Sequence, residues 1–157
     1  MTDKIHFRPF HKRDASEFKA LNIEWLEAFF EVEPYDELIL SNPQTQIIDQ
    51  GGSIFMVYKE AKPIGTFAFL KKEEGLYEFS KMAVTPKERG KGYGNLIMQF
   101  AIRYAEQHHW DSLILYSSTL LKNSIYLYSK YGFVEVPIDP DIKYARGDIK
   151  MKLKLNP

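Results

Sequence analysis

Three alternating glycines and two cations stand together in Arg89-Gly90-Lys91-Gly92-Tyr93-Gly94, between a predicted strand and a predicted helix. Glycines there let the backbone approach a ligand closely and adopt positive φ. The first turn of the following helix exposes unpaired N–H groups at the positive end of its dipole, which suits an anion and above all a phosphate. A flexible turn would need neither this glycine pattern nor the charges. The segment therefore predicts a phosphate-binding loop.

Two familiar phosphate motifs do not fit this loop. The dinucleotide fingerprint Gly-x-Gly-x-x-Gly would place a glycine where the chain has Asn95. The P-loop pattern needs a Gly-Lys pair followed by Ser or Thr, whereas Gly90-Lys91 is followed by Gly92. The loop thus indicates a phosphate ligand of another kind.

The overall composition narrows the class of protein. The 157 residues contain 21 basic and 21 acidic side chains, and 45% are hydrophobic. This predicts one globular domain over residues 1–157. Zero formal net charge argues against a general nucleic-acid-binding role. Because the sequence has no membrane-length apolar run and no signal-peptide pattern, we expect a cytoplasmic protein with no membrane partner.

Cysteine is absent from the chain, which excludes disulfides, thiolate metal sites and a cysteine nucleophile. The neighbouring His108 and His109 would lie on different helix faces, and no other histidine supplies a metal-binding spacing. We therefore predict no metal. A serine hydrolase is not expected either, because the Gly-x-Ser-x-Gly elbow is missing.

The charges are unevenly distributed along the chain. Residues 20–58 contain 7 acidic side chains and no Lys or Arg, whereas residues 59–157 carry 16 basic and 11 acidic ones. A polarised chain can offer two partners of opposite sign two different surfaces. The alternative is that the acidic segment is simply a solvated face.

The hydrophobic pattern predicts a mixed α/β domain. Helices are expected from Asp14 towards Phe29, around residues 35–40, after the glycine loop, and over residues 118–131, with a further helical turn or two at 44–50. Strands are expected at 4–9, 53–59, 64–70, 76–84, 110–117, 133–136 and 148–155. The last strand alternates Lys with Met and Leu, and as an exposed strand it could pair across a homodimer.

The glycine loop also matches the pattern Arg/Gln-x-x-Gly-x-Gly/Ala, with Arg89, Gly92 and Gly94 at the fixed positions. Three further segments agree: Phe7-Arg8-Pro9 with Asp14 downstream, Lys81-Met82-Ala83-Val84-Thr85-Pro86 before the loop, and Leu127-Tyr128-Ser129-Lys130-Tyr131-Gly132-Phe133 after it. Together and in this order, they resemble the GNAT superfamily of acyl-CoA-dependent N-acyltransferases over nearly the whole chain.

The resemblance implies a central twisted mixed sheet, flanked by helices and splayed between its fourth and fifth strands, at 76–84 and 112–117. It implies acetyl-CoA as cosubstrate, with the pyrophosphate on the loop amides and the pantetheine arm paired with the preceding strand end. Asn123 is less securely placed, because relatives often carry this Asn two positions earlier; an N-cap is its alternative role. The implied cofactor-binding residues are Met82, Ala83, Val84, Arg89, Gly90, Lys91, Gly92, Tyr93, Gly94 and Asn123.

The implied reaction is acetyl transfer to a primary amine, which must first lose the proton it holds with a pKa near ~10.4. Tyr128 stands at the place of the family's general acid, facing the CoA sulfur. Glu78 is the candidate general base, and we expect its neighbours Tyr77 and Phe79 to raise its pKa; an ordinary ion pair with an ordered water as base is the alternative. The backbone N–H of Val84 would stabilise the oxyanion. Without cysteine, direct attack in a ternary complex is predicted.

In this family the acceptor enters between the first two helices and the loop that joins the last two strands. Aromatic and acidic residues alternate in those helices, which suits a small cationic amine, although core packing is the alternative for the aromatic rings. Arg146 could hold an acceptor carboxylate or pair with Asp139 or Asp141. The candidate substrate-binding residues are Trp25, Phe29, Glu31, Tyr35, Tyr144 and Arg146.

Two other functions are compatible with the same sequence. The acceptor could be a protein N-terminus or lysine, or the chain could be a non-catalytic acyl-CoA-binding sensor, because fold does not determine activity. The intact Arg89, Gly92, Gly94 and Tyr128 favour an enzyme. The sequence leaves open the identity of the amine, acetyl against longer acyl groups, and the oligomeric state.

Overall fold

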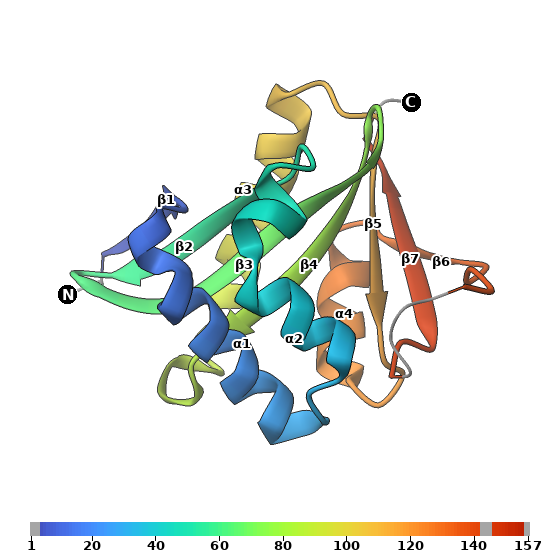
Figure 1. The fold of residues 1–157 in the computed structure, drawn as a ribbon. Helices are drawn as coiled ribbons and strands as arrows, with labels where there is room; N and C mark the ends of the chain where they lie inside the picture. Colours follow the sequence, from blue (N-terminus) through green and yellow to red (C-terminus); the bar gives the residue numbers. More distant parts are fainter. Residues whose placement is uncertain (1–3, 142–145, 156–157) are drawn as a thin grey trace. The chain divides into compact units, whose positions relative to one another are not determined.

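A computed structural model describes residues 4–141 and 146–155, and it confirms a mixed α/β fold (Figure 1). The hydrogen-bonded strand order is β1-β2-β3-β4-β5-β7-β6. Contacts group the chain into two compact units, Met1–Lys71 with Phe79–Arg89, and Lys72–Glu78 with Gly90–Pro157. The strands are β1 (Ile5–Pro9), β2 (Ser53–Lys59), β3 (Lys62–Glu73), β4 (Leu76–Val84), β5 (Ser112–Ser117), β6 (Val134–Val136) and β7 (Ile149–Lys154).

The helices follow the predicted order along the chain. The long ones are α1 (Ala15–Phe29), α2 (Pro34–Ser41), α3 (Tyr93–Gln107) and α4 (Lys122–Lys130). Short 3₁₀ turns occupy Lys12–Asp14 and Pro86–Glu88, and the helical turn expected at 44–50 is a π-helix over Gln44–Ile48. None of the helices formed by the described residues is long and apolar enough to cross a membrane.

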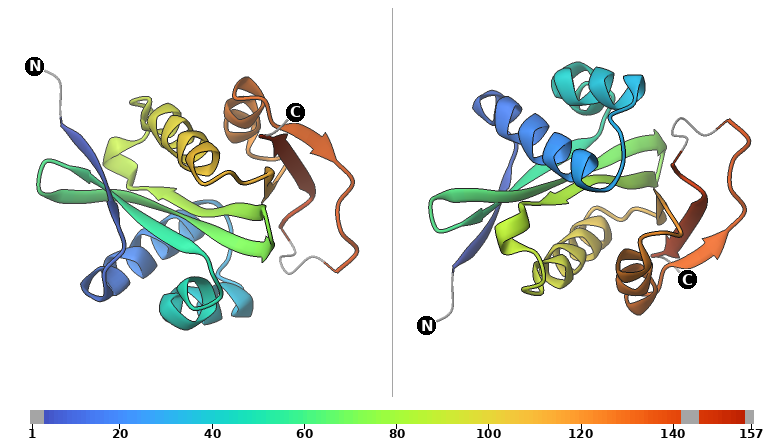
Figure 2. Two further views of the ribbon diagram at one scale, coloured as in Figure 1. Left: turned by 90° about the horizontal axis from the view of Figure 1, so that it is seen from above. Right: turned by 90° about the horizontal axis from the view of Figure 1, so that it is seen from below.

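In the first unit, β1, β2 and β3 form an antiparallel meander in which Phe7 is opposite Val57 and Met56 is opposite Thr66. Helices α1 and α2 lie side by side on one face of these strands (Figure 2). Their apolar sides meet inward-facing strand residues in a closed core because the hydrophobic positions recur at helical spacing. That core consists of Phe18, Leu21, Leu26, Ile39, Leu40, Ile47, Ile54, Met56, Ala68 and Ala83.

In the second unit, the start of β4 pairs in parallel with β5, with Leu76 opposite Ser112 and Glu78 opposite Ile114. This ladder ends at Glu78, where the chain passes into the first unit. Helices α3 and α4 lie side by side in both views of Figure 2. Tyr77 stacks on Trp110 with ring centroids 3.6 Å apart, which fixes the β4 end of the unit.

The final strand, β7, is not at a sheet edge. It pairs with β5 on one side and with β6 on the other. The expectation that the last strand is exposed for pairing across a homodimer is therefore wrong, because β5 covers its whole length on one side and β6 covers Lys150–Lys152 on the other. The strand next to it, β6, is at the end of the sheet order instead.

Local sequence signals set the helix limits. Pro34 begins α2 at a position that needs no backbone N–H, and the Asp36 carboxylate accepts a hydrogen bond of 2.9 Å from the Glu33 N–H. In α3 the buried residues recur at three- and four-residue spacing and are Ile97, Met98, Ala101 and Ala105, whereas Leu96 is exposed.

Candidate functional site

The glycine loop has the backbone geometry that a closely approaching ligand requires. Gly90 and Gly92 have φ of 76° and 84°, and a Cβ at either position would meet no heavy atom within 4 Å. Gly92 is also the N-cap of α3, and no side chain caps that helix end. The open side of the loop and the N–H groups of the first helical turn are therefore arranged as an anion cradle. Whether Gly90, Lys91, Tyr93 and Gly94 contact CoA stays a prediction.

The strand that leads to the loop carries a backbone feature that no sequence signal announces. Lys81, in the middle of β4, has φ of 57°, a left-handed conformation that costs a non-glycine residue about 1–2 kcal/mol. Such a residue locally kinks and twists a strand. It therefore changes the direction of the three residues that the resemblance assigns to pantetheine: Met82, Ala83 and Val84.

The beginning of the loop is anchored within the first unit. The Thr85 N–H donates to the Ile64 carbonyl at 2.8 Å. Glu88, at the end of the short 3₁₀ turn, pairs with Lys59 at 3.1 Å between Oε1 and Nζ. The Arg89 Nε donates to the Val84 carbonyl at 2.8 Å, and its guanidinium carbon lies 5.3 Å from the centre of the Phe29 ring. The first cation of the loop therefore turns towards α1.

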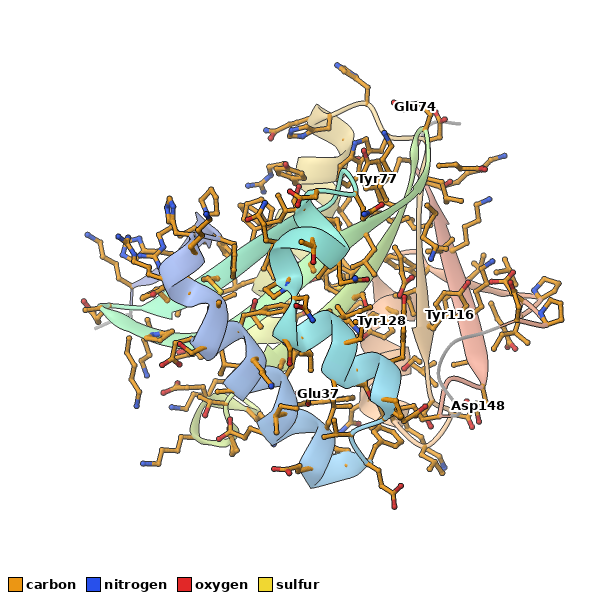
Figure 3. All side chains as sticks on the ribbon, in the orientation of Figure 1. Glu37, Glu74, Tyr77, Tyr116, Tyr128 and Asp148 are labelled. Carbon is orange, nitrogen blue, oxygen red and sulfur yellow. The ribbon has the colours of Figure 1, made fainter. Side chains whose placement is uncertain are left out.

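Tyr128 comes from the second turn of α4 (Figure 3). Its ring packs edge-on against Phe133, with centroids 6.1 Å apart, and burial raises the pKa of its hydroxyl to about 12. Among the described residues, none accepts a hydrogen bond from this hydroxyl. The group is thus a neutral donor over the whole physiological pH range, as a general acid requires.

The raised pKa of Tyr128 predicts a specific loss of stability in alkali. The folded protein keeps this proton while an unfolded tyrosine loses its own near pH 10, so stability is full below pH 10 and falls as the pH rises to about 12. The loss attributable to this residue is about 2–3 kcal/mol. Between pH 9 and pH 12, the urea midpoint of unfolding should fall less in Tyr128→Phe than in the wild type. An equal fall in both proteins would show that burial of the hydroxyl has no such effect.

Residues far apart in sequence hold the segment that precedes α4. Asp148, next to β7, accepts hydrogen bonds from the Thr119 N–H at 2.8 Å and from its hydroxyl at 2.7 Å. The Thr119 hydroxyl, followed by the Thr119 N–H, lowers the pKa of the Asp148 carboxyl. Sequence reasoning missed this pair because 29 residues separate the partners.

Glu78 is 5% exposed and lies 3.5 Å from Lys72, measured from Oε1 to Nζ. This is the ion pair that the sequence left as the alternative reading. The two aromatic neighbours that were expected to surround the carboxylate are engaged elsewhere, Tyr77 on Trp110 and Phe79 on Phe67, because successive strand residues point to opposite faces.

Tyr116, which was not among the predicted site residues, is affected by the charge of Glu78. Tyr116 on β5 (Figure 3) donates a short hydrogen bond to Asp139, whose carboxylate is also 3.1 Å from the Lys150 Nζ. Burial raises the pKa of Tyr116, followed by the bond to Asp139 and the charge of Glu78. The Tyr116 bond and then that from Lys150 lower the pKa of Asp139. The antiparallel register of β5 and β7 places Tyr116 opposite Lys150 and so brings these groups together.

The structure bears on two expectations, the N-cap role of Asn123 and the pairing of Arg146 with Asp139. Asn123 is the second residue of α4, whose N-cap is Leu121, so the alternative N-cap role of Asn123 is wrong. Its side chain is exposed, and contact with pantetheine stays a prediction. Asp139, offered above as a partner of Arg146, is bound by Tyr116 and Lys150. Tyr144 lies outside the described residues.

The predicted acceptor segment has a mixed surface. Phe29 is 47% exposed at the end of α1, and Trp25 packs on it with centroids 5.3 Å apart. Tyr35 is partly buried against the core of the first unit, whereas Glu31 is exposed. Tyr35 is therefore better explained as a core-packing residue, whereas the exposed Phe29 stays a candidate for substrate binding.

Some of the acidic residues in this segment have structural roles. Glu37 pairs with Lys19 at 2.7 Å and accepts a hydrogen bond from Ser41, and these two partners lower the pKa of Glu37. Asp36 is buried in the cap of α2. Glu24 and Glu27 on α1 and Glu31 just after it are exposed to solvent. Within the described ranges, no group of three or more histidine and carboxylate side chains is placed to hold a metal ion.

Comparison with known proteins gives both sequence and structural relatives. Streptothricin acetyltransferase A of Bacillus subtilis is 25% identical over 91 residues, which cover 58% of this chain and 53%, about half, of that protein. An acetyltransferase of the GNAT family from Staphylococcus aureus superimposes with a TM-score of 0.85 at 16% identity, covering 98% of this chain and all of that one.

A dodecameric spermidine N-acetyltransferase from Vibrio cholerae has a TM-score of 0.73 at 21% identity, with 96% of this chain and 94% of that one covered. At these identities the two solved structures establish the fold. The profile of the acetyltransferase (GNAT) family matches residues 17–133, which include most of α1, the glycine loop and Tyr128. The chain therefore belongs to the acetyltransferase (GNAT) family.

Proposed function

We propose that this protein transfers an acetyl group from acetyl-CoA to the primary amine of a small cationic acceptor. The observation that carries the proposal is the loop at the N-terminus of α3, where Gly90 and Gly92 adopt positive φ and leave the Cβ positions open. This geometry suits the pyrophosphate of CoA. Lys91, exposed on the same loop, would add favourable charge.

The pantetheine arm would pair with the end of β4. Its amide groups resemble a peptide, so they can extend a strand through backbone hydrogen bonds. The left-handed Lys81 changes the direction of the strand just before Met82–Val84. In this arrangement the Val84 N–H would donate to the oxygen that becomes negative as the amine attacks the thioester.

Tyr128 would act on the departing sulfur. A thiol has an ordinary pKa near ~8.5, well below the value of about 12 for Tyr128, so complete proton transfer from the phenol is uphill. The hydroxyl would therefore stabilise the developing thiolate chiefly by a hydrogen bond, and the proton would reach the product thiol as that product meets water. Because the chain has no cysteine, the acetyl group passes directly to the amine.

Glu78 would accept the proton that the acceptor ammonium must lose. The carboxylate is buried, and its Oε1 lies 3.5 Å from the Lys72 Nζ, an ion pair that would hold it in place on β4. An ordered water that relays the proton to Glu78 or to solvent is the alternative base.

A cationic acceptor is supported by charge and by relatives. The exposed carboxylates of Glu24, Glu27 and Glu31 accompany the partly exposed Trp25 and Phe29, and aromatic faces with carboxylates attract ammonium groups. A solved relative acts on spermidine, which carries several amines. Oligomerisation, which the same relative shows, is a further property that we propose to test.

Release of free CoA tests the function directly. Because the chain contains no cysteine, a thiol reagent will report CoA with no background from the protein. We expect release with polyamines and aminoglycosides, and much slower release with acidic amino acids. Preferred use of peptide N-termini or lysines would assign a protein acceptor. Tight acetyl-CoA binding with no thiol release across the whole amine panel would contradict an enzyme and favour the sensor function.

A further inference from the structure

The side chain of Arg89, the first cation of the glycine loop, is held within the first unit. Its Nε donates to the Val84 carbonyl at 2.8 Å, and its guanidinium lies over the Phe29 ring at 5.3 Å. One of its terminal nitrogens, Nη2, is shielded from solvent and has no hydrogen-bond partner. To bind a phosphate through its guanidinium, this arginine would have to give up the Val84 bond and the Phe29 contact.

The carbonyl that Arg89 holds belongs to a strand end under strain. Lys81, three residues before Val84, is left-handed, and such a conformation persists only where the surrounding structure over-determines it. The Thr85 N–H bond to the Ile64 carbonyl and the Arg89 bond to the Val84 carbonyl fix the two sides of the peptide that follows Val84. Together they limit the rotation of the strand end.

The same guanidinium also contacts the aromatic end of α1. Phe29 lies between it and Trp25, whose ring centroid is 5.3 Å from that of Phe29. A planar guanidinium can donate through Nε in its plane while its face packs on a ring, which a lysine ammonium cannot reproduce. This makes the side chain a link between the end of β4 and the end of α1.

We propose that Arg89 is a positioning residue and not a phosphate ligand. It holds the end of β4 in the geometry that the reaction needs and connects this strand end to Phe29 at the end of α1. This inference rests on the proposed function. The action of Arg89 on the reaction passes through the Val84 backbone. Lys91, on the exposed side of the loop, is the cation that acts on the phosphates.

Three variants separate these roles. Arg89→Lys keeps the charge but loses the Nε geometry, Arg89→Gln loses both, and Lys91→Gln is the matched control for a phosphate contact. We expect both Arg89 variants to lower kcat about 10-fold with the KM for acetyl-CoA changed less than about threefold, because the strand end moves while the phosphate site stays. Lys91→Gln should raise that KM and flatten the salt dependence of CoA binding, and Arg89→Gln should leave the salt dependence unchanged.

Two results would overturn the proposal in favour of a phosphate contact. One is a wild-type kcat in Arg89→Lys, and the other is a flattened salt dependence of CoA binding in Arg89→Gln. Hydrogen exchange supplies a readout that does not need turnover. The amides of residues 82–85 should exchange faster in both Arg89 variants than in the wild type, and unchanged exchange would contradict the positioning role. If the wild type acetylates no amine, the proposed function fails, and this exchange result still decides the role of Arg89.

Discussion

Replacing Tyr128 with phenylalanine should lower kcat by about 10²- to 10³-fold, the range typical of losing one hydrogen-bond donor to a developing negative charge. The ring would remain packed on Phe133, 6.1 Å away between centroids, so the fold and the affinity for acetyl-CoA should change little. The phenol is the hydrogen-bond donor that burial keeps neutral to about pH 12. Without it, the departing thiolate would form with less stabilisation.

This expectation is measured by free-thiol release in the steady state, together with acetyl-CoA binding by calorimetry. Tyr126, two residues earlier on α4, is 72% exposed and provides the control. Tyr126→Phe should keep full activity. Tyr128→Phe with normal acetyl-CoA binding and undiminished kcat would remove Tyr128 from the mechanism.

Replacing Gly92 with alanine should raise the KM for acetyl-CoA about 10-fold or more, and valine should raise it further. The residue has φ of 84°, and its missing Cβ faces a space without protein atoms within 4 Å. A side chain there would both disfavour the left-handed backbone, by about 1–2 kcal/mol, and stand where the pyrophosphate should meet the helix amides. Each 1.4 kcal/mol lost in binding is about tenfold in affinity.

The control is a glycine of similar backbone conformation in another part of the chain. Gly51 has φ of 97°, and its added Cβ would meet the side chain of Lys71, with Cδ nearest at 2.8 Å. Gly51→Ala should lower the urea midpoint but leave the KM for acetyl-CoA unchanged. If Gly92→Ala loses stability to the same extent yet binds acetyl-CoA normally, the loop is not the phosphate site.

The positions of the elements follow closely from local sequence signals. Ser53–Lys59 and Leu76–Val84 are strands with the predicted bounds, since turn residues enclose β-forming runs there. The glycine loop opens α3 as expected, and the family match confirms the resemblance read from its motif. These features depend on residues that lie within a few positions of one another.

The surroundings of the candidate catalytic groups depend on distant residues. The expected aromatic shell of Glu78 failed because strand alternation turns Tyr77 and Phe79 away from it, and the chain supplies Lys72 from the preceding strand instead. Likewise, the pairing of Asp139 with Tyr116 could not be deduced from the sequence, because it needs the registers of β5 and β7. Long-range side-chain contacts are set by packing, which local patterns do not encode.

By itself the sequence determined the order of the elements, the glycine loop that begins α3, the resemblance to the family and the absence of a cysteinyl intermediate, because spacing and residue type suffice for these. Only the tertiary structure decided that Lys81 is left-handed, that Arg89 turns to Val84 and Phe29, and that the last strand is enclosed on both sides. A long side chain has many rotamers of similar energy, so its direction is chosen by whichever distant partner the fold brings within reach.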